Sequence, residues 1–112
     1  MKIYHNNRCS KSRQCLAILE KSNQDFEIIN YLDTPPSTNE LKKLLKMLGI
    51  KPLELVRKNE AIWKEKFKGK ELTEQAIITA MVTYPKLIER PIIVKGTKAV
   101  IGRPIENVQQ LL

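Results

Sequence analysis

Two strand-like runs on either side of one helix-like segment constrain the fold of this chain more than any other feature. The runs are Lys2–His5, in which polar and apolar residues alternate, and Phe26–Ile29. Between them, Ser12–Lys21 carries Leu16 and Leu19 at helical spacing. A strand, a helix and a strand within about thirty residues predict a βαβ unit with parallel strands and a right-handed crossover.

Helical patterns fill the middle of the chain. Ser37–Glu40 has the spacing of a capping box before a leucine-rich helix that Gly49 is expected to end. Glu60–Phe67 is also compatible with a helix. Thr73 is placed to cap a further helix, which Pro85 stops.

The C-terminal part predicts a hairpin and a last helix. Pro91–Val94 and Ala99–Ile101 are β-rich runs joined by the turn-forming residues 95–98, and Pro104 suits the first turn of a final helix. The whole order is that of an α/β, thioredoxin-like fold with a helical insertion. We therefore expect residues 1–112 to form one thioredoxin-like domain, with the insertion at about residues 37–84, before the hairpin.

Composition narrows the function classes. The chain has 112 residues, of which 42% are hydrophobic and 29% charged, and its longest apolar runs are too short to cross a bilayer. It begins directly in a strand-like run, which predicts a cytoplasmic protein whose two cysteines are free thiols. The net charge is +8, but lysines alternate with glutamates and aromatic residues are few, which argues against nucleic acid as the primary partner.

Cys9 lies where the first strand is expected to pass into the first helix. Helix N-termini present unpaired N–H groups and a positive dipole end, and both favour an anion. Arg8, Lys11 and Arg13 add positive charge around the thiol. These effects lower a thiol pKa, so Cys9 is the candidate nucleophile.

Spacing excludes two classes of cysteine enzyme and leaves a third. A dithiol oxidoreductase needs a second cysteine at position 12, which is Ser12. A phosphatase of the Cys-x5-Arg type needs arginine at position 15, which is Cys15. Because six helical residues rotate by about 600°, we interpret Cys15 as a core thiol that points away from Cys9. A monothiol oxidoreductase of the Cys-x-x-Ser form remains possible.

Over essentially its whole length the chain resembles the family of glutaredoxin-coupled arsenate reductases. The resemblance is most specific in four segments, which are Tyr4–Asn6 with Cys9–Arg13, Leu55–Arg57, Glu89–Val94 and Ile101–Pro104. It implies that Cys9 is the catalytic cysteine. It also implies that Arg57, Arg90 and Arg103 hold the oxyanion, and guanidinium forks suit its several acceptor oxygens.

The resemblance assigns supporting roles to further residues. Pro91 falls on the cis-proline of thioredoxin-like folds, opposite the active cysteine. His5 falls on a histidine that helps to acidify the thiol, although a structural histidine at a strand end is an equal alternative. Ser12 and Arg13 match residues that close the loop, and Asn7 replaces the usual proline of this loop.

By resemblance, the protein is an arsenate reductase that forms a covalent Cys9 thiol–arsenate adduct. Glutathione would act as co-substrate and release arsenite, and glutaredoxin would remove glutathione from Cys9. Neither a bound cofactor nor a metal is implied. Two alternatives remain: a monothiol glutaredoxin-like oxidoreductase and a regulator related to Spx that binds RNA polymerase. The latter class typically senses oxidation through the Cys-x-x-Cys motif that this chain lacks.

Overall fold

The computed structural model describes all residues from Met1 to Leu112, and the chain divides into two compact units. The first unit consists of Met1–Thr34 and Arg90–Leu112, and the second of Pro35–Glu89. The second unit contains the region predicted as a helical insertion. None of the helices combines the length and the apolar character needed to span a bilayer.

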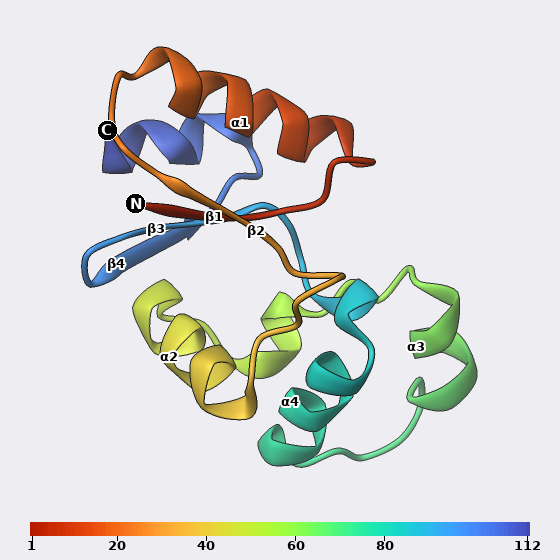
Figure 1. Ribbon diagram of the computed structural model, residues 1–112. Helices are drawn as coiled ribbons and strands as arrows, with labels where there is room; N and C mark the ends of the chain where they lie inside the picture. Colours follow the sequence, from red (N-terminus) through yellow and green to blue (C-terminus); the bar gives the residue numbers. More distant parts are fainter. The chain divides into compact units, whose positions relative to one another are not determined.

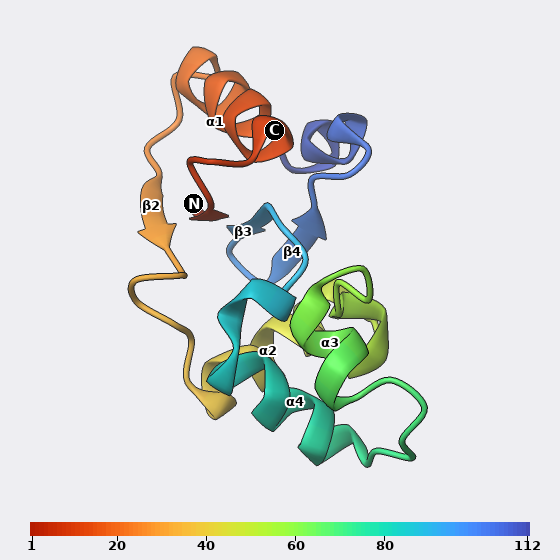
Figure 2. The ribbon, with the colours of Figure 1, turned by 90° about the vertical axis from the view of Figure 1, so that its right-hand side faces the viewer.

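The first unit is built on a four-stranded mixed sheet (Figure 1 and Figure 2). The strands are β1 (Lys2–His5), β2 (Glu27–Asn30), β3 (Ile92–Lys95) and β4 (Lys98–Ile101), in the order β2-β1-β3-β4. β1 pairs with β2 in parallel, whereas β3 pairs antiparallel with both β1 and β4. The βαβ unit and the hairpin are therefore confirmed, with strand ends within one residue of those predicted.

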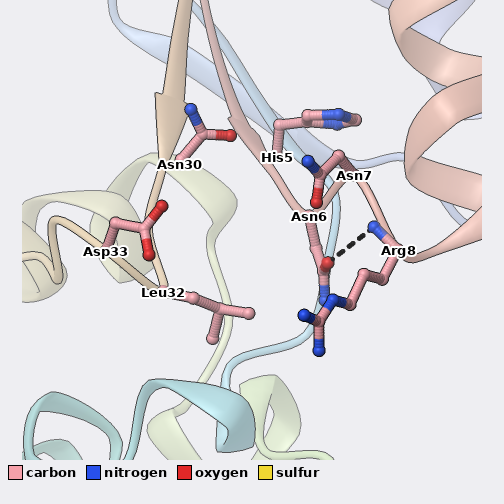
Figure 3. Close-up of a pocket in the computed structure, with 7 residues that line it drawn as sticks. All are labelled: His5, Asn6, Asn7, Arg8, Asn30, Leu32 and Asp33. Atoms are coloured by element: carbon pink, nitrogen blue, oxygen red, sulfur yellow. Dashed lines mark hydrogen bonds between the residues drawn. The ribbon is translucent and has the colours of Figure 1, made fainter.

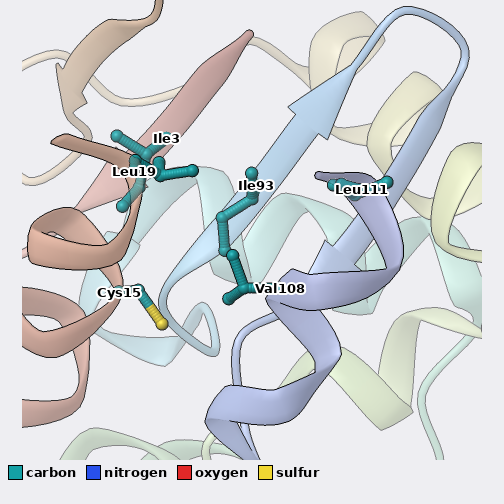
Figure 4. Packing of buried hydrophobic residues seen from close by; sticks show 6 residues of the cluster. All are labelled: Ile3, Cys15, Leu19, Ile93, Val108 and Leu111. Atoms are coloured by element: carbon teal, nitrogen blue, oxygen red, sulfur yellow. The ribbon is translucent and has the colours of Figure 1, made fainter. Parts of the chain in front are cut away.

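Two helical segments cover one face of this sheet (Figure 1). They are α1 (Ser10–Lys21) and the 3-10 helix η3 (Ile105–Leu111). Buried residues of both helices meet those of the central strands in a cluster of Ile3, Cys15, Leu19, Ile93, Val108 and Leu111 (Figure 4). Cys15 is fully buried there and forms no disulfide, which confirms its interpretation as a core thiol.

Gly102 follows β4 where the backbone approaches this core closely. A Cβ atom added at Gly102 would lie 2.6 Å from Cys15 Sγ and 2.9 Å from Pro91 Cγ. Contacts this short force the neighbouring atoms to move. Gly102 does not adopt the left-handed backbone conformation. The close approach of Cys15 and Pro91, rather than the backbone angles, therefore requires glycine at this position.

We expect Gly102→Ala to lower the free energy of unfolding by roughly 1–3 kcal/mol, the usual cost of overpacking. Urea denaturation followed by circular dichroism would measure the change. Adding Cys15→Ala should recover part of the loss, because it removes the nearest atom. A double variant whose loss equals the sum of the two single losses would contradict this account.

The second unit is helical. It contains α2 (Thr38–Leu48), α3 (Ala61–Lys66), α4 (Glu74–Thr83) and the short 3-10 helices η1 (Pro52–Leu55) and η2 (Pro85–Leu87). The predicted caps are present, because Ser37 Oγ accepts a hydrogen bond from Glu40 N at 3.1 Å and Thr73 Oγ1 accepts one from Ala76 N at 3.1 Å. α2 packs against α4, and buried leucines of α2 face this interior.

Candidate active site

Cys9 is the N-cap residue of α1, directly after the three-residue loop that follows β1. Its backbone N–H donates to Asn6 O at 3.0 Å, which closes a tight turn, and its carbonyl accepts from Arg13 N at 3.0 Å, which starts the helix. The side chain is 8% exposed. Cys9 thus lies at the helix N-terminus, where the sequence predicted the nucleophile.

Several groups of the first unit lower the pKa of Cys9. Burial by itself raises this pKa, but it is outweighed by the Ser12 N–H, the Arg90 side chain, the charge of Arg103 and the Lys11 N–H. The net result is a Cys9 pKa of about 7. This lowered pKa makes the thiolate, which is the nucleophilic form, more available at neutral pH than in a free cysteine.

Arg103 makes the most direct contact with the thiol. Its Nη2 donates to Cys9 Sγ at 3.0 Å, and its Nε donates to Arg90 O at 2.7 Å. The second bond anchors the guanidinium to the backbone at the start of the hairpin. Because the fork is held in this way, Arg103 presents a fixed positive group beside the sulfur.

Arg90 contributes a second guanidinium. Its side chain interacts with Cys9 and with Tyr31, and both interactions favour its charged form. Burial lowers the pKa of Arg90, but the interactions with Cys9 and Tyr31 outweigh this effect and raise it. The Arg90–Pro91 peptide bond is cis, as is Arg103–Pro104. The structure therefore brings Cys9, Arg90 and Arg103 together within the first unit.

His5 and Ser12 form a buried pair behind the loop. His5 Nδ1 lies 2.6 Å from Ser12 Oγ, which also accepts a hydrogen bond from Asn6 N at 3.1 Å. Burial lowers the pKa of His5, and the charge of Arg13 lowers it further. Both effects favour the neutral form of His5, and the partner of this imidazole in the loop is Ser12.

The loop between β1 and α1 is closed by Arg13, whose Nη1 donates to Asn7 O at 2.9 Å. Asn7, at the position of the proline expected from the resemblance, does not have a positive φ; Asn23 is the non-glycine residue that does. The tolerance of asparagine for unusual backbone angles is thus not used at Asn7. The contact to Arg13 uses only the backbone of Asn7.

Arg57 belongs to the second unit. Its Nη1 lies 3.2 Å from Glu89 Oε1 and its Nε lies 3.5 Å from Glu60 Oε1. Its backbone N–H donates to Leu87 O at 2.7 Å. Two carboxylates thus engage Arg57 within its own unit, and its part in holding an oxyanion remains a prediction.

Two contributors escaped the sequence analysis. Asn6 organises the loop, since its carbonyl accepts from Cys9 N, its N–H donates to Ser12 Oγ and its Oδ1 accepts from Arg8 N at 2.9 Å. The preference of asparagine for such turns was the available signal. Tyr31 directly follows β2 and interacts with Arg90. Its approach to Arg90 depends on the arrangement of the strands in the sheet.

The two thiols should differ sharply in their reactivity with iodoacetamide. Since only the thiolate reacts, the alkylation rate of Cys9 should rise with pH to a midpoint of about 7, whereas burial raises the pKa of Cys15 to about 11. Mass spectrometry of the modified peptides, taken at a series of pH values, would assign each rate. A Cys9 midpoint near 8.5, the value of a free cysteine, would contradict the stabilisation described above.

Comparison with known proteins agrees with this geometry. Residues 4–111 match the ArsC family. The chain is 46% identical to "Uncharacterized protein YfgD" of Escherichia coli K12, over 100% of this chain and 96% of that protein. It is 40% identical to an arsenate reductase of Neisseria meningitidis serogroup A, over 100% of this chain and 97% of that protein.

A solved structure shows the same fold. The arsenate reductase from Vibrio cholerae matches with a TM-score of 0.94 and 44% identity, over 100% of this chain and 98% of that one. The chain therefore belongs to the ArsC family, as the family-specific segments indicated. Its α/β architecture is the thioredoxin-like fold of that family.

Proposed function

We propose that this protein reduces arsenate to arsenite through Cys9. The observation that carries the proposal is the pair of arginines at a thiol whose pKa is about 7, with Arg103 Nη2 at 3.0 Å from the sulfur. An oxyanion that approaches this sulfur meets two guanidinium groups. Relatives that are arsenate reductases, 40% identical over the full chain, favour arsenate as that oxyanion.

In the proposed reaction, the Cys9 thiolate attacks arsenic and a sulfur–arsenic bond forms. One arsenic–oxygen bond breaks, and that hydroxyl group takes up a proton from solvent and leaves as water. Arg90 and Arg103 stabilise the negative charge on the arsenate oxygens, and we assign the same role to Arg57. The glutathione thiol then supplies the second sulfur. Arsenic(V) takes up two electrons and leaves as arsenite, while Cys9 and glutathione become a mixed disulfide. Glutaredoxin then removes glutathione from Cys9, as an exchange between thiol and disulfide.

The other residues have structural parts in this scheme. His5 and Ser12 hold the loop in shape, and Arg13 closes it. An external reductant fits the arrangement of the two cysteines, because Cys15 is fully buried in the core. Two thiols at the site, as in a Cys-x-x-Cys enzyme, would need no glutathione.

The test is arsenate reduction in a coupled assay that contains glutathione and glutaredoxin. We expect turnover that disappears when arsenate, glutathione or glutaredoxin is omitted. Turnover no greater than that of a Cys9→Ser variant would refute the proposal. The buried position of Cys15 also suits a monothiol oxidoreductase, and activity on glutathionylated substrates without arsenate reduction would favour that function instead.

A further inference from the structure

A pocket of about 410 Å³ lies beyond the carboxyl ends of β1 and β2 (Figure 3). One wall comes from the end of β1 and its loop, and the other from the end of β2 and the turn after it. The lining residues are His5, Asn6, Asn7, Arg8, Asn30, Leu32 and Asp33. This size is typical of small-molecule sites, and the carboxyl edge of neighbouring parallel strands is where open α/β sheets bind ligands.

The pocket has opposite charges on its two walls. Arg8 lies on the β1 side and Asp33 on the β2 side (Figure 3). The ion pairs of the protein involve Arg57 with Glu60 and Glu89, so the two pocket charges do not neutralise each other. An ammonium and a carboxylate on one ligand would complement both walls, and hydrogen bonds between charged groups are the stronger kind.

Asparagine side chains add polar groups to this lining. Asn7 and Asn30 are exposed, and each amide offers both donors and an acceptor. Such groups suit the peptide and amino-acid parts of a small ligand. The composition of the pocket is therefore that of a site for a zwitterionic amino-acid group.

The pocket shares its wall with the turn that holds the nucleophile. Arg8 directly precedes Cys9, and Asn6 O accepts the hydrogen bond from Cys9 N at 3.0 Å. A tripeptide spans roughly 10 Å when extended. A tripeptide thiol bound in the pocket by one end therefore has the length to present its sulfur near Cys9.

We propose that this pocket binds the γ-glutamyl zwitterion of glutathione, with its carboxylate at Arg8 and its ammonium at Asp33. The inference rests on the proposed function for the identity of the thiol. It assigns the selection of the reducing thiol to the loops after β1 and β2. The oxyanion site does not have this role.

The test uses a reaction that needs no arsenate. The Cys9 thiolate attacks one sulfur of glutathione disulfide, a Cys9–glutathione disulfide forms, the original sulfur–sulfur bond breaks and a glutathione thiolate leaves. Intact-protein mass spectrometry measures the rate. Hydroxyethyl disulfide serves as the comparison reagent, because it has the same reactive bond but no zwitterion.

We expect Arg8→Gln and Asp33→Asn each to slow the reaction with glutathione disulfide about tenfold, the effect of one charged hydrogen bond, and to slow the reaction with hydroxyethyl disulfide much less. Lys21→Gln and Asp25→Asn are the matched controls, because they remove the same charges as the two pocket variants. Both residues are exposed and lie outside the pocket. S-methylglutathione should slow the wild-type reaction with hydroxyethyl disulfide by occupying the pocket.

Equal rates for the pocket variants and their controls would overturn the inference. So would equal slowing with both disulfides, because this would indicate a general change at Cys9. The arsenate assay reports separately on the proposed function. A protein without arsenate turnover, but with much greater slowing for glutathione disulfide than for hydroxyethyl disulfide, would refute that function and uphold the pocket.

Discussion

Replacing Cys9 by serine should abolish arsenate reduction, with a loss of more than about 10³-fold in turnover. The hydroxyl of serine stays protonated near neutral pH and cannot form the disulfide that the second half of the reaction needs. The groups that give Cys9 a pKa of about 7 stabilise a thiolate, so they have no equivalent anion to act on in the variant. The measurement is the initial rate of arsenite formation with glutathione and glutaredoxin in excess.

Cys15→Ala is the matched control for this variant, because it removes the other thiol. Cys15 is fully buried, and its Sγ lies 3.5 Å from Gly102 O, so the variant should lose some stability and keep its turnover. Thermal unfolding of both variants would separate loss of fold from loss of chemistry. A folded Cys9→Ser protein that still reduces arsenate would show that another group is the nucleophile.

Arg103→Gln should lower kcat/KM for arsenate by about 10²–10³-fold, the range found when one group that stabilises a transition-state oxyanion is lost. The variant loses the charged donor at 3.0 Å from Cys9 Sγ. Because the positive charge favours the thiolate, its removal should also raise the Cys9 pKa above 7. Kinetics with arsenate, together with thiolate absorbance near 240 nm as the pH is raised, would measure both effects.

Arg103→Lys separates charge from shape at this position. Lysine keeps a cation that helps the thiolate, but it cannot bond to Arg90 O and Cys9 Sγ through one rigid fork. We therefore expect a smaller rise in the Cys9 pKa than with glutamine and a comparable loss of arsenate turnover. Lys21→Gln, which removes an exposed charge elsewhere, should change neither quantity. An unchanged thiol pKa in Arg103→Gln would contradict the role assigned to Arg103.

The parts of the fold that depend on local pattern were predicted well from the sequence. The alternation in Lys2–His5, the caps at Ser37 and Thr73 and the turn at Gly96 each specify an element through interactions over a few residues. The sequence predicted a final helix but not its type. Ile105–Leu111 is a 3-10 helix, a distinction that apolar spacing over seven residues does not make.

The features of the site that depend on neighbouring residues could be predicted from the sequence, whereas the contacts between distant segments could not. The position of Cys9 at a helix N-terminus follows from a strand pattern next to a helix pattern. The contact of His5 with Ser12 depends on the path of the loop, and the interaction of Arg90 with Tyr31 depends on the arrangement of the strands, so neither follows from local sequence. For Arg103, the resemblance to a family supplied the expectation, and the contact with Cys9 spans 94 positions of sequence.

The amino-acid sequence by itself determined the order of the elements, the place of the candidate nucleophile and the absence of a Cys-x-x-Cys pair, because these depend on neighbouring residues. Only the tertiary structure decided which groups reach the Cys9 sulfur, which side chain His5 contacts and where a charged pocket opens beside the loop. The physical reason is that these contacts join distant segments through the sheet. The pairing of His5 with Asn30 and of Tyr4 with Ile92 sets which loops meet.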